Sequence, residues 1–191
     1  ANTINGAGNT AANSLRGLGG NDIYVVGGGD TIVEALGAPG GVDTVSSSLI
    51  SLNLASYLNV ENVTLTGSLG LIATGNASAN TINGAGNAAA NSLRGLGGND
   101  YYVVGGGDTI VELAGVPGGV DTVNSSLLSL NLASYANVEN MSLGGSLALN
   151  ATGSAAANVV SGNVGSNVLN GLGGNDILTG GSGIDFFVFN T

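Results

Sequence analysis

Large apolar residues recur along the chain in short blocks of about nine residues. At the C-terminal end the sequence divides into GSAAANVVS, GNVGSNVLN, GLGGNDILT and GGSGIDFFV. In each block a glycine stands first, Asn or Asp stands sixth and a large apolar residue stands eighth. Glycines adopt backbone conformations that a side chain forbids, so each block predicts a turn followed by a very short strand, with its eighth residue pointing into a core.

The sixth and eighth positions form two columns when the blocks are aligned, with one block in each copy extended to eleven residues. The sixth position holds Asn2, Asn13, Asp22, Asn80, Asn91, Asp100, Asn158, Asn167, Asp176 and Asp185. The eighth position holds Ile4, Leu15, Tyr24, Ile82, Leu93, Tyr102, Val160, Leu169, Leu178 and Phe187. One block cannot bury its apolar residue alone, whereas stacked rungs about 4.8 Å apart place like residues over like. We therefore expect an all-β fold, a parallel β-roll or β-solenoid in which each nonapeptide-like block forms one stacked rung.

The blocks belong to a longer repeat. ANTINGAGN at residue 1 recurs at residue 79, and 15 of the 78 aligned positions differ. A third, shorter copy begins near Ala157. We divide the expected solenoid into repeat copies at 1–78, 79–156 and 157–191, because self-similarity at a fixed period is typical of repeat architectures.

The middle of each long copy is less regular. It contains YVVGGGDTIVE, then GVDTV, then NLASY and NVEN. Alternating Val, Thr, Leu and Ser, punctuated by glycine, predicts further strands joined by irregular corners. In SSLISLNLASY and SSLLSLNLASY the apolar residues fall at mixed spacing, so a helix remains an open alternative there.

Composition changes this picture in one respect, the identity of the partner. The 36 glycines, three Phe and no Trp disfavour a compact aromatic core, while 43% hydrophobic and 7% charged residues argue against disorder. The formal net charge is −10, with only two basic residues. Nucleic acid and anionic membrane surfaces should be repelled, so a cation is the expected partner.

Several kinds of chemistry are excluded by residues that the chain lacks. There is no Cys for a disulfide or thiolate site, no His for proton transfer, and no Lys for a phosphate-binding P-loop. Paired carboxylates can hydrolyse glycosides, but no pair is marked here, so we expect a protein that is not an enzyme. There is no apolar run long enough to cross a membrane, no initial Met and no basic leader, so we expect neither membrane insertion nor a signal peptide, but a piece of a longer protein.

GGSGID followed by FF, and GLGGND followed by IL, resemble the GGxGxDxUx nonapeptide of RTX, or haemolysin-type, calcium-binding repeats. The long copies are similar to an RTX variant in which GGND with YVV is followed by GDTIVE, GVDTV, NVEN and a TGN segment. The resemblance implies a parallel β-roll in a bacterial protein exported by type I secretion. It also implies Ca²⁺ held between loops two blocks apart.

In that family the calcium ligands are the sixth-position Asp carboxylates and nearby loop carbonyls. The resemblance therefore implies six metal ligands: Asp176, Asp185, Asp22, Asp100, Asp30 and Asp108. Asp176 and Asp185 match the motif best, and Asp30 and Asp108 match it most loosely. Six of the ten sixth positions are Asn, which brings no charge, so we expect sparse Ca²⁺ sites.

The family's full turn consists of two nonapeptide blocks, which implies how these ligands would pair. The loop of Asp185 would stack on that of Asn167, and the loop of Asp176 on that of Asn158. Each site would then hold one charged ligand, and Asn side chains could hydrogen-bond along the axis elsewhere.

Other charged and aromatic residues receive structural interpretations. Asp favours tight turns even without an ion, which is the alternative for every candidate ligand. A turn or rim position is favoured over metal binding for Asp30, Asp43, Asp108 and Asp121. Solvent exposure is expected for Glu34, Glu61, Glu112 and Glu139. Ion pairs with neighbouring carboxylates are expected for Arg16 and Arg94. A place in the core at the end of the coil, packed against a capping segment that is not part of this sequence, is expected for Phe186, Phe187 and Phe189.

These expectations lead to a secreted structural or adhesive segment at the bacterial cell surface or outside the cell. Ca²⁺ would assist its folding after export, and open coil ends would allow end-to-end stacking into a filament or matrix. Two alternatives remain open. The segment could be the C-terminal module of a secreted hydrolase or epimerase, or its Thr and Asn rows could bind ice or another surface.

Overall fold

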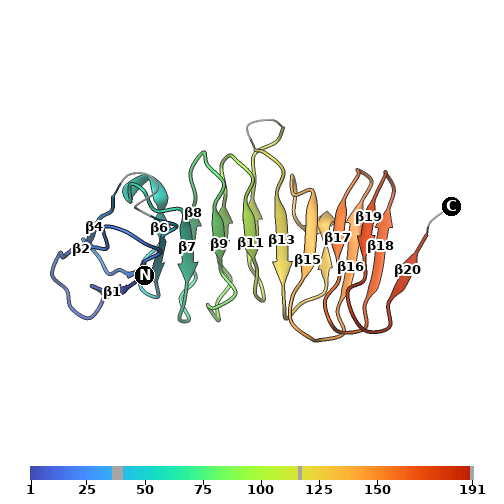
Figure 1. Ribbon diagram of the computed structural model, residues 1–191, viewed down its shortest axis with the longest axis horizontal. Helices are drawn as coiled ribbons and strands as arrows, with labels where there is room; N and C mark the ends of the chain where they lie inside the picture. Colours follow the sequence, from blue (N-terminus) through green and yellow to red (C-terminus); the bar gives the residue numbers. More distant parts are fainter. Residues whose placement is uncertain (36–40, 116–117, 190–191) are drawn as a thin grey trace.

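The chain winds into one elongated solenoid, with its two termini at opposite ends (Figure 1). The computed structural model describes residues 1–35, 41–115 and 118–189. Within these ranges every strand pairing is parallel, and the only helical elements are two short 3₁₀ turns. The expected all-β parallel solenoid is confirmed.

One face of the solenoid is a continuous ten-stranded sheet. Its strands follow one another along the axis in the order of the sequence, each separated from the next by a strand on the other face (Figure 1). They are β1 (Thr3–Asn5), β3 (Ile23–Val25), β5 (Thr44–Ser47), β7 (Asn62–Leu65), β9 (Thr81–Asn83), β11 (Tyr101–Val103), β13 (Thr122–Ser125), β15 (Asn140–Leu143), β17 (Val159–Ser161) and β19 (Ile177–Thr179).

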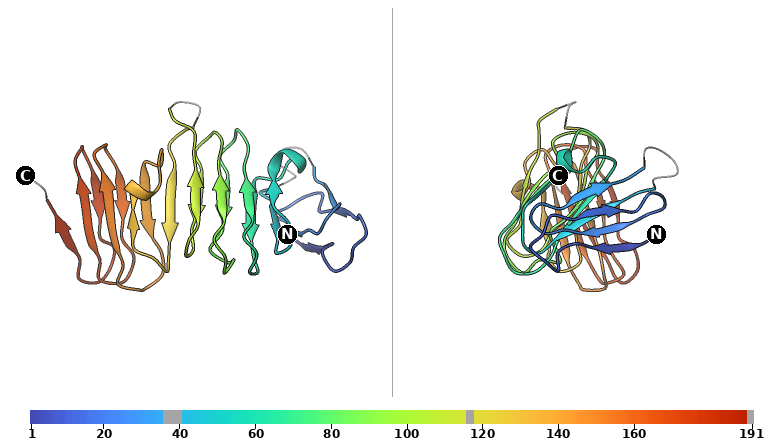
Figure 2. Two further views of the ribbon diagram at one scale, coloured as in Figure 1. Left: turned by 180° about the vertical axis from the view of Figure 1, so that it is seen from behind. Right: turned by 90° about the vertical axis from the view of Figure 1, so that its left-hand side faces the viewer.

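In residues 1–35, 41–115 and 118–189 the second face is divided into three shorter sheets. The first contains β2 (Ser14–Arg16) and β4 (Thr31–Val33). The second contains β6 (Leu52–Asn53), β8 (Ile72–Thr74), β10 (Ser92–Arg94) and β12 (Thr109–Val111). The third contains β14 (Leu130–Asn131), β16 (Asn150–Ser154), β18 (Val168–Leu172) and β20 (Phe186–Val188). The two interruptions, between β4 and β6 and between β12 and β14, fall at equivalent places in the two long copies; Figure 2 shows the solenoid from behind and end-on.

Each coil contains two blocks, one on each face. Equivalent corner residues of successive coils are separated by 20, 21, 18 and 19 residues over the first four steps, which together make up one long copy. The expectation that every nonamer is a full rung is therefore wrong, because consecutive nonamers lie on opposite faces and like residues stack at every second block. The coil of two nonapeptide blocks implied by the family occurs in the third copy, where Val159 pairs with Ile177.

The eighth-position residues form the thin core, as expected. Seven of the ten are buried: Leu15, Tyr24, Ile82, Leu93, Tyr102, Val160 and Leu169. Ile4 and Leu178 are partly buried against this core. Small residues elsewhere in each coil let the two faces approach closely enough for these side chains to fill the interior.

The three Phe residues are exposed within the described chain, and a core completed by a capping segment stays a prediction. Phe187 is 41% exposed, and Phe186 and Phe189 are more exposed still. In the described part of the chain β20 pairs only with β18. Successive side chains of a strand point to opposite faces, so Phe186 points outward beside the inward-directed Phe187.

The segments SSLISLNLASY and SSLLSLNLASY, for which a helix was an alternative, each form a short strand and a single 3₁₀ turn. In the first copy β6 leads into η1 (Leu54–Ser56), and in the second β14 leads into η2 (Leu132–Ser134). The Asn53 side chain accepts a hydrogen bond from the Ala55 N–H, at 2.9 Å, and so caps η1. Among the described residues, no helix has the length and apolar character needed to cross a membrane.

Candidate metal centres

A column of polar residues runs along the corner that leads into the ten-stranded sheet. One of them immediately precedes each strand: Asn2, Asp22, Asp43, Glu61, Asn80, Asp100, Asp121, Glu139, Asn158 and Asp176. Backbone N–H groups of one coil donate to side-chain oxygens of the next coil. The Asp100 N–H donates to Asp121 Oδ1 at 2.7 Å, and the Asp121 N–H donates to Glu139 Oε2 at 2.8 Å. The carboxylates therefore act as axial acceptors that join successive coils.

A second column of polar residues runs along the opposite corner. The single sixth-position column predicted from the sequence contains residues of both corners. In the second column Asp108 Oδ1 accepts from both the backbone and the side-chain nitrogen of Asn91, at 2.9 Å each. Its Oδ2 accepts from the Gly105 N–H at 2.8 Å. Asp30 makes the equivalent contacts in the first copy, and the hydrogen bonds that its carboxylate accepts, first that from the Gly27 N–H, lower its pKa. Both oxygens of each carboxylate thus already have donors.

The nonapeptide aspartates of the third copy stack as expected. The Asn158 N–H donates to Asp176 Oδ1 and the Asn167 N–H donates to Asp185 Oδ1, each at 2.9 Å. Each stacked pair contains one carboxylate and one amide, which confirms the expected pairing of loops 18 residues apart. Whether these residues hold Ca²⁺ stays a prediction.

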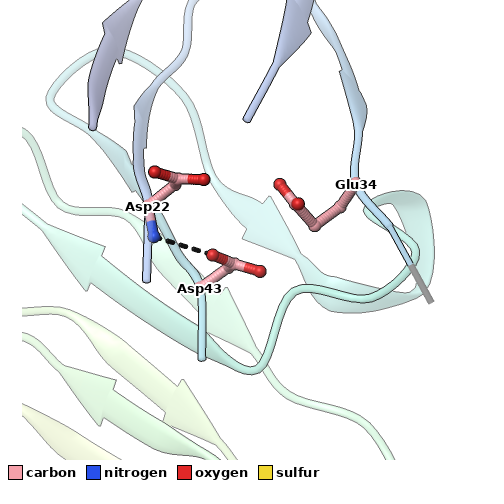
Figure 3. A group of neighbouring side chains, drawn as sticks. All are labelled: Asp22, Glu34 and Asp43. Atoms are coloured by element: carbon pink, nitrogen blue, oxygen red, sulfur yellow. Dashed lines mark hydrogen bonds between the residues drawn. The ribbon is translucent and has the colours of Figure 1, made fainter. Parts of the chain in front are cut away.

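Among the described residues, two groups of three carboxylates meet inside the solenoid, one in each long copy. They consist of Asp22, Glu34 and Asp43, and of Asp100, Glu112 and Asp121. In each group one oxygen from every residue lies within 4.8 Å of the others. Figure 3 shows the first group, in which the three side chains point toward one another and the Asp22 N–H donates to the Asp43 carboxylate.

The second group is built by three consecutive elements. Asp100 immediately precedes β11, Asp121 immediately precedes β13 in the next coil, and Glu112 immediately follows β12 on the opposite face. The Tyr102 hydroxyl, whose ring is in the core, donates a hydrogen bond to Glu112 Oε2. The Leu113 N–H donates to Glu112 Oε1 at 2.8 Å. Glu112 is therefore held in place toward the two aspartates.

A glycine leaves the room for this arrangement. A Cβ atom on Gly95 would overlap Asp100 Oδ2, the Tyr102 hydroxyl and Glu112 Oε2, and Gly17 has the equivalent surroundings in the first copy. Gly171 likewise lies directly under the Asp176 carboxylate. The glycine that opens a block is thus required because the carboxylate of the sixth residue folds back over it.

The aspartates of both groups have buried oxygens without partners. In the described ranges, Oδ2 of Asp22, Asp43, Asp100 and Asp121 accepts no hydrogen bond. Burial, followed by repulsion from neighbouring carboxylates, raises the pKa of Asp100 and of Asp121 to about 7 each. Burial also raises the pKa of Asp43. Such a group favours binding either a proton or a cation, and a set of carboxylate oxygens suits a hard cation such as Ca²⁺.

A family model of the RTX calcium-binding nonapeptide repeat (4 copies) matches residues 2–33, 74–111 and 152–187. The chain belongs to this family. Comparisons with curated proteins and with solved structures give no match. The RTX segments contain all six aspartates predicted as ligands: Asp22, Asp30, Asp100, Asp108, Asp176 and Asp185.

The other members of the two acidic groups lie outside the matched RTX segments and were misjudged from the sequence. Glu112 was expected in solvent but is 8% exposed, and Glu34, Glu61 and Glu139 are only partly exposed. A rim position for Asp43 and Asp121 is also wrong, since each is 1% exposed. One feature of the sequence could have indicated the burial of Asp43 and Asp121. Each stands directly before a Thr-Val strand, the position that Asp and Asn occupy elsewhere in the RTX blocks.

The two arginines of this RTX chain do not neutralise the acids. Arg16 and Arg94 are exposed, and over the part of the chain that the structure describes neither forms an ion pair with a carboxylate. The expected pairing is wrong because both side chains alternate outward from strands whose middle residue, Leu15 or Leu93, points into the core.

Proposed function

We propose that this RTX segment is a structural rod of a secreted protein, and that Ca²⁺ assists its folding outside the cell. The observation that carries the proposal is the stacking of nonapeptide loops from successive coils. Asp185 and Asn167 are 18 residues apart in the chain, yet their loops are joined by a hydrogen bond of 2.9 Å. Ligands that meet only in the wound chain bind an ion only when it is folded, so binding stabilises the fold.

A structural role is supported by what the carboxylates do in the solenoid. The corner aspartates accept backbone N–H groups of the neighbouring coil, so they contribute to the connection between coils. We rank Asp176, Asp185, Asp22 and Asp100 as the primary nonapeptide ligands. Asp30 and Asp108 rank below them, because donors already satisfy both oxygens of each.

The test is circular dichroism of the chain, first in EDTA and then with Ca²⁺ added into the millimolar range. Weak extracellular sites bind at about 10⁻⁴ to 10⁻³ M. We expect the β-sheet signal or the melting temperature to rise over that range. An unchanged spectrum and melting temperature would remove Ca²⁺ as a folding partner and leave only the rod.

End-to-end association is the second part of the proposal. In the described residues β19 and β20 each pair on one side only, and the side chains of Phe187 and Phe189 at this coil are exposed. Open edges and apolar ends favour pairing with another coil, and we propose a second copy of this chain as that partner. Light scattering across a concentration series should show linear association, and a monomer at every concentration contradicts it.

A second candidate function is binding to a flat surface such as ice. All ten strands of the continuous sheet lack charged residues, and Thr, Ser and Asn are frequent at their outward positions. A regular, uncharged polar face of this kind suits adsorption to an ordered surface. Measuring thermal hysteresis of freezing tests it, and a value indistinguishable from that of a buffer control would rule it out.

A further inference from the structure

We propose that each long copy holds a divalent-cation site of a second kind, formed by Asp22, Glu34 and Asp43 in the first copy and by Asp100, Glu112 and Asp121 in the second. The sites are separate from the nonapeptide turns of the third copy. Two of the three ligands in each site lie outside the matched RTX segments. The inference deepens the calcium role proposed above, but it does not depend on Asp176 or Asp185.

The ligands converge because of an irregularity in the coil. Asp100 and Asp121 lie 21 residues apart, which makes theirs the longest coil in the repeat. They precede the paired strands β11 and β13, and at the same level the second-face sheet is interrupted between β12 and β14. Glu112 follows β12 directly, so its side chain reaches the corner where the two aspartates stack.

The buried, unpartnered oxygens point to a ligand. Asp100 is 2% exposed and Asp121 is 1% exposed, and in the described residues the Oδ2 atom of each accepts no hydrogen bond. Buried polar atoms nearly always have partners, so atoms of this kind call for a specific explanation. A bound cation supplies the missing partner for both at once.

The space and the spread of the oxygens suit Ca²⁺. Ca–O distances of about 2.3 to 2.6 Å place oxygens on opposite sides of the ion roughly 4.6 to 5.2 Å apart. The three ligand oxygens lie within 4.8 Å of one another, inside that span. Gly95 keeps the space between Asp100, Tyr102 and Glu112 free of a side chain.

The surroundings hold the carboxylates in position. Asp100 Oδ1 accepts from the Asn80 N–H at 2.8 Å, and Asp121 Oδ1 accepts from the Asp100 N–H at 2.7 Å. Glu112 is fixed by the Tyr102 hydroxyl and the Leu113 N–H. Each carboxylate is thereby oriented by one or more hydrogen bonds from its surroundings, as ligands in built metal sites generally are.

The test measures Ca²⁺ binding to the whole chain by calorimetry and Tb³⁺ binding by luminescence on tyrosine excitation. Tyr24 and Tyr102 donate hydrogen bonds to Glu34 and Glu112, whereas residues 157–191 contain no tyrosine. Tb³⁺ in the proposed sites should therefore be sensitised strongly, and Tb³⁺ at Asp176 or Asp185 should not. Added Ca²⁺ should displace the sensitised Tb³⁺.

Asp121→Asn is the first variant, because Asn keeps the Oδ1 acceptor for the Asp100 N–H. Glu112→Gln is the second, in case the first does not fold. We expect each to weaken Ca²⁺ binding at the second-copy site about tenfold or more and to remove about half of the sensitised signal, while the first-copy site is unchanged. The double variant Asp176→Asn, Asp185→Asn is the matched control and should keep the full signal.

The outcomes separate the two proposals. If the control variant loses Ca²⁺ binding while Asp121→Asn and Glu112→Gln keep it, or if no Tb³⁺ is sensitised, the inference is overturned and the nonapeptide role stands. If Ca²⁺ binding falls only in Asp121→Asn and Glu112→Gln, the inference holds and the ion acts outside the third-copy turns.

Discussion

Replacing Asp121 with Asn should stabilise the metal-free protein and destabilise the calcium-loaded one. The pKa of Asp121 is raised from an ordinary value of 3.8 to about 7, first by burial and then by Glu112 and Glu139. At pH 8 the unfolded chain ionises this group without penalty, while the folded protein ionises it against a pKa that burial has raised from 3.8 to about 7. One pKa unit corresponds to about 1.4 kcal/mol, so Asn should relieve up to about 4 kcal/mol in EDTA.

The assay is thermal unfolding followed by circular dichroism at pH 8, in EDTA and in 5 to 10 mM Ca²⁺, roughly ten times the weak end of the extracellular range. For a chain of this size about 2 to 4 °C accompany each kcal/mol, so the ceiling in EDTA is a rise of roughly 8 to 16 °C. In Ca²⁺ the sign should reverse, because a ligand has been removed. Asp176→Asn is the control; its stacked neighbour is Asn158, and its effect in EDTA should stay within about 0.5 kcal/mol. A lower melting temperature for Asp121→Asn in EDTA refutes the reasoning, because the carboxylate would then be stabilising without an ion.

Two further predictions concern the same interior. The raised pKa values of Asp100 and Asp121 mean that between about pH 4 and pH 7 the folded protein binds more protons than the unfolded chain. Stability in EDTA should therefore fall as the pH rises over that interval and level off above about pH 7. Melting curves from pH 4 to 8 check this, and a flat or rising profile contradicts it. Gly95→Ala should lower the free energy of unfolding by about 1 to 3 kcal/mol and lower Ca²⁺ affinity, since its Cβ would overlap the acidic group. Gly106→Ala is the control: its Cβ has open space around it, so its free energy of unfolding should stay within about 0.5 kcal/mol of that of the unmodified chain. Urea titration measures both variants.

The sequence predicted the fold well because its information is periodic. Gly at the first position, Asn or Asp at the sixth and a large apolar residue at the eighth each have a local physical reason, and stacking repeats that reason in every coil. The burial of Leu15, Leu93 and Leu169 follows from this pattern alone. The pattern could not predict that consecutive blocks lie on opposite faces of the solenoid, because the sequence of one block carries no information about the face on which the next block lies.

The sequence analysis did not predict the acidic groups, because their members are far apart in the sequence and most of them lie in the irregular part of the repeat. Glu112 follows a strand on one face and Asp121 precedes one on the other, so the nine-residue period does not link them to Asp100. They meet where the longest coil of the repeat coincides with an interruption of the second-face sheet. By contrast, the stacking of Asp185 on Asn167 followed from the coil of two nonapeptide blocks that the family resemblance implied.

The two faces of the rod should respond differently to mechanical load. Ten strands form an unbroken backbone ladder on one side, whereas on the other side the ladder stops between β4 and β6 and again between β12 and β14. In the described residues no backbone ladder crosses those two levels on that side. Side-chain amides span them instead: Asn59 donates to the Glu34 carbonyl at 3.4 Å and Asn137 donates to the Glu112 carbonyl at 3.1 Å. We therefore expect the rod to bend more easily at these two levels than elsewhere. The acidic groups lie at the same two levels, so a cation bound there would act as a removable brace and make the stiffness of the rod depend on the calcium concentration around it.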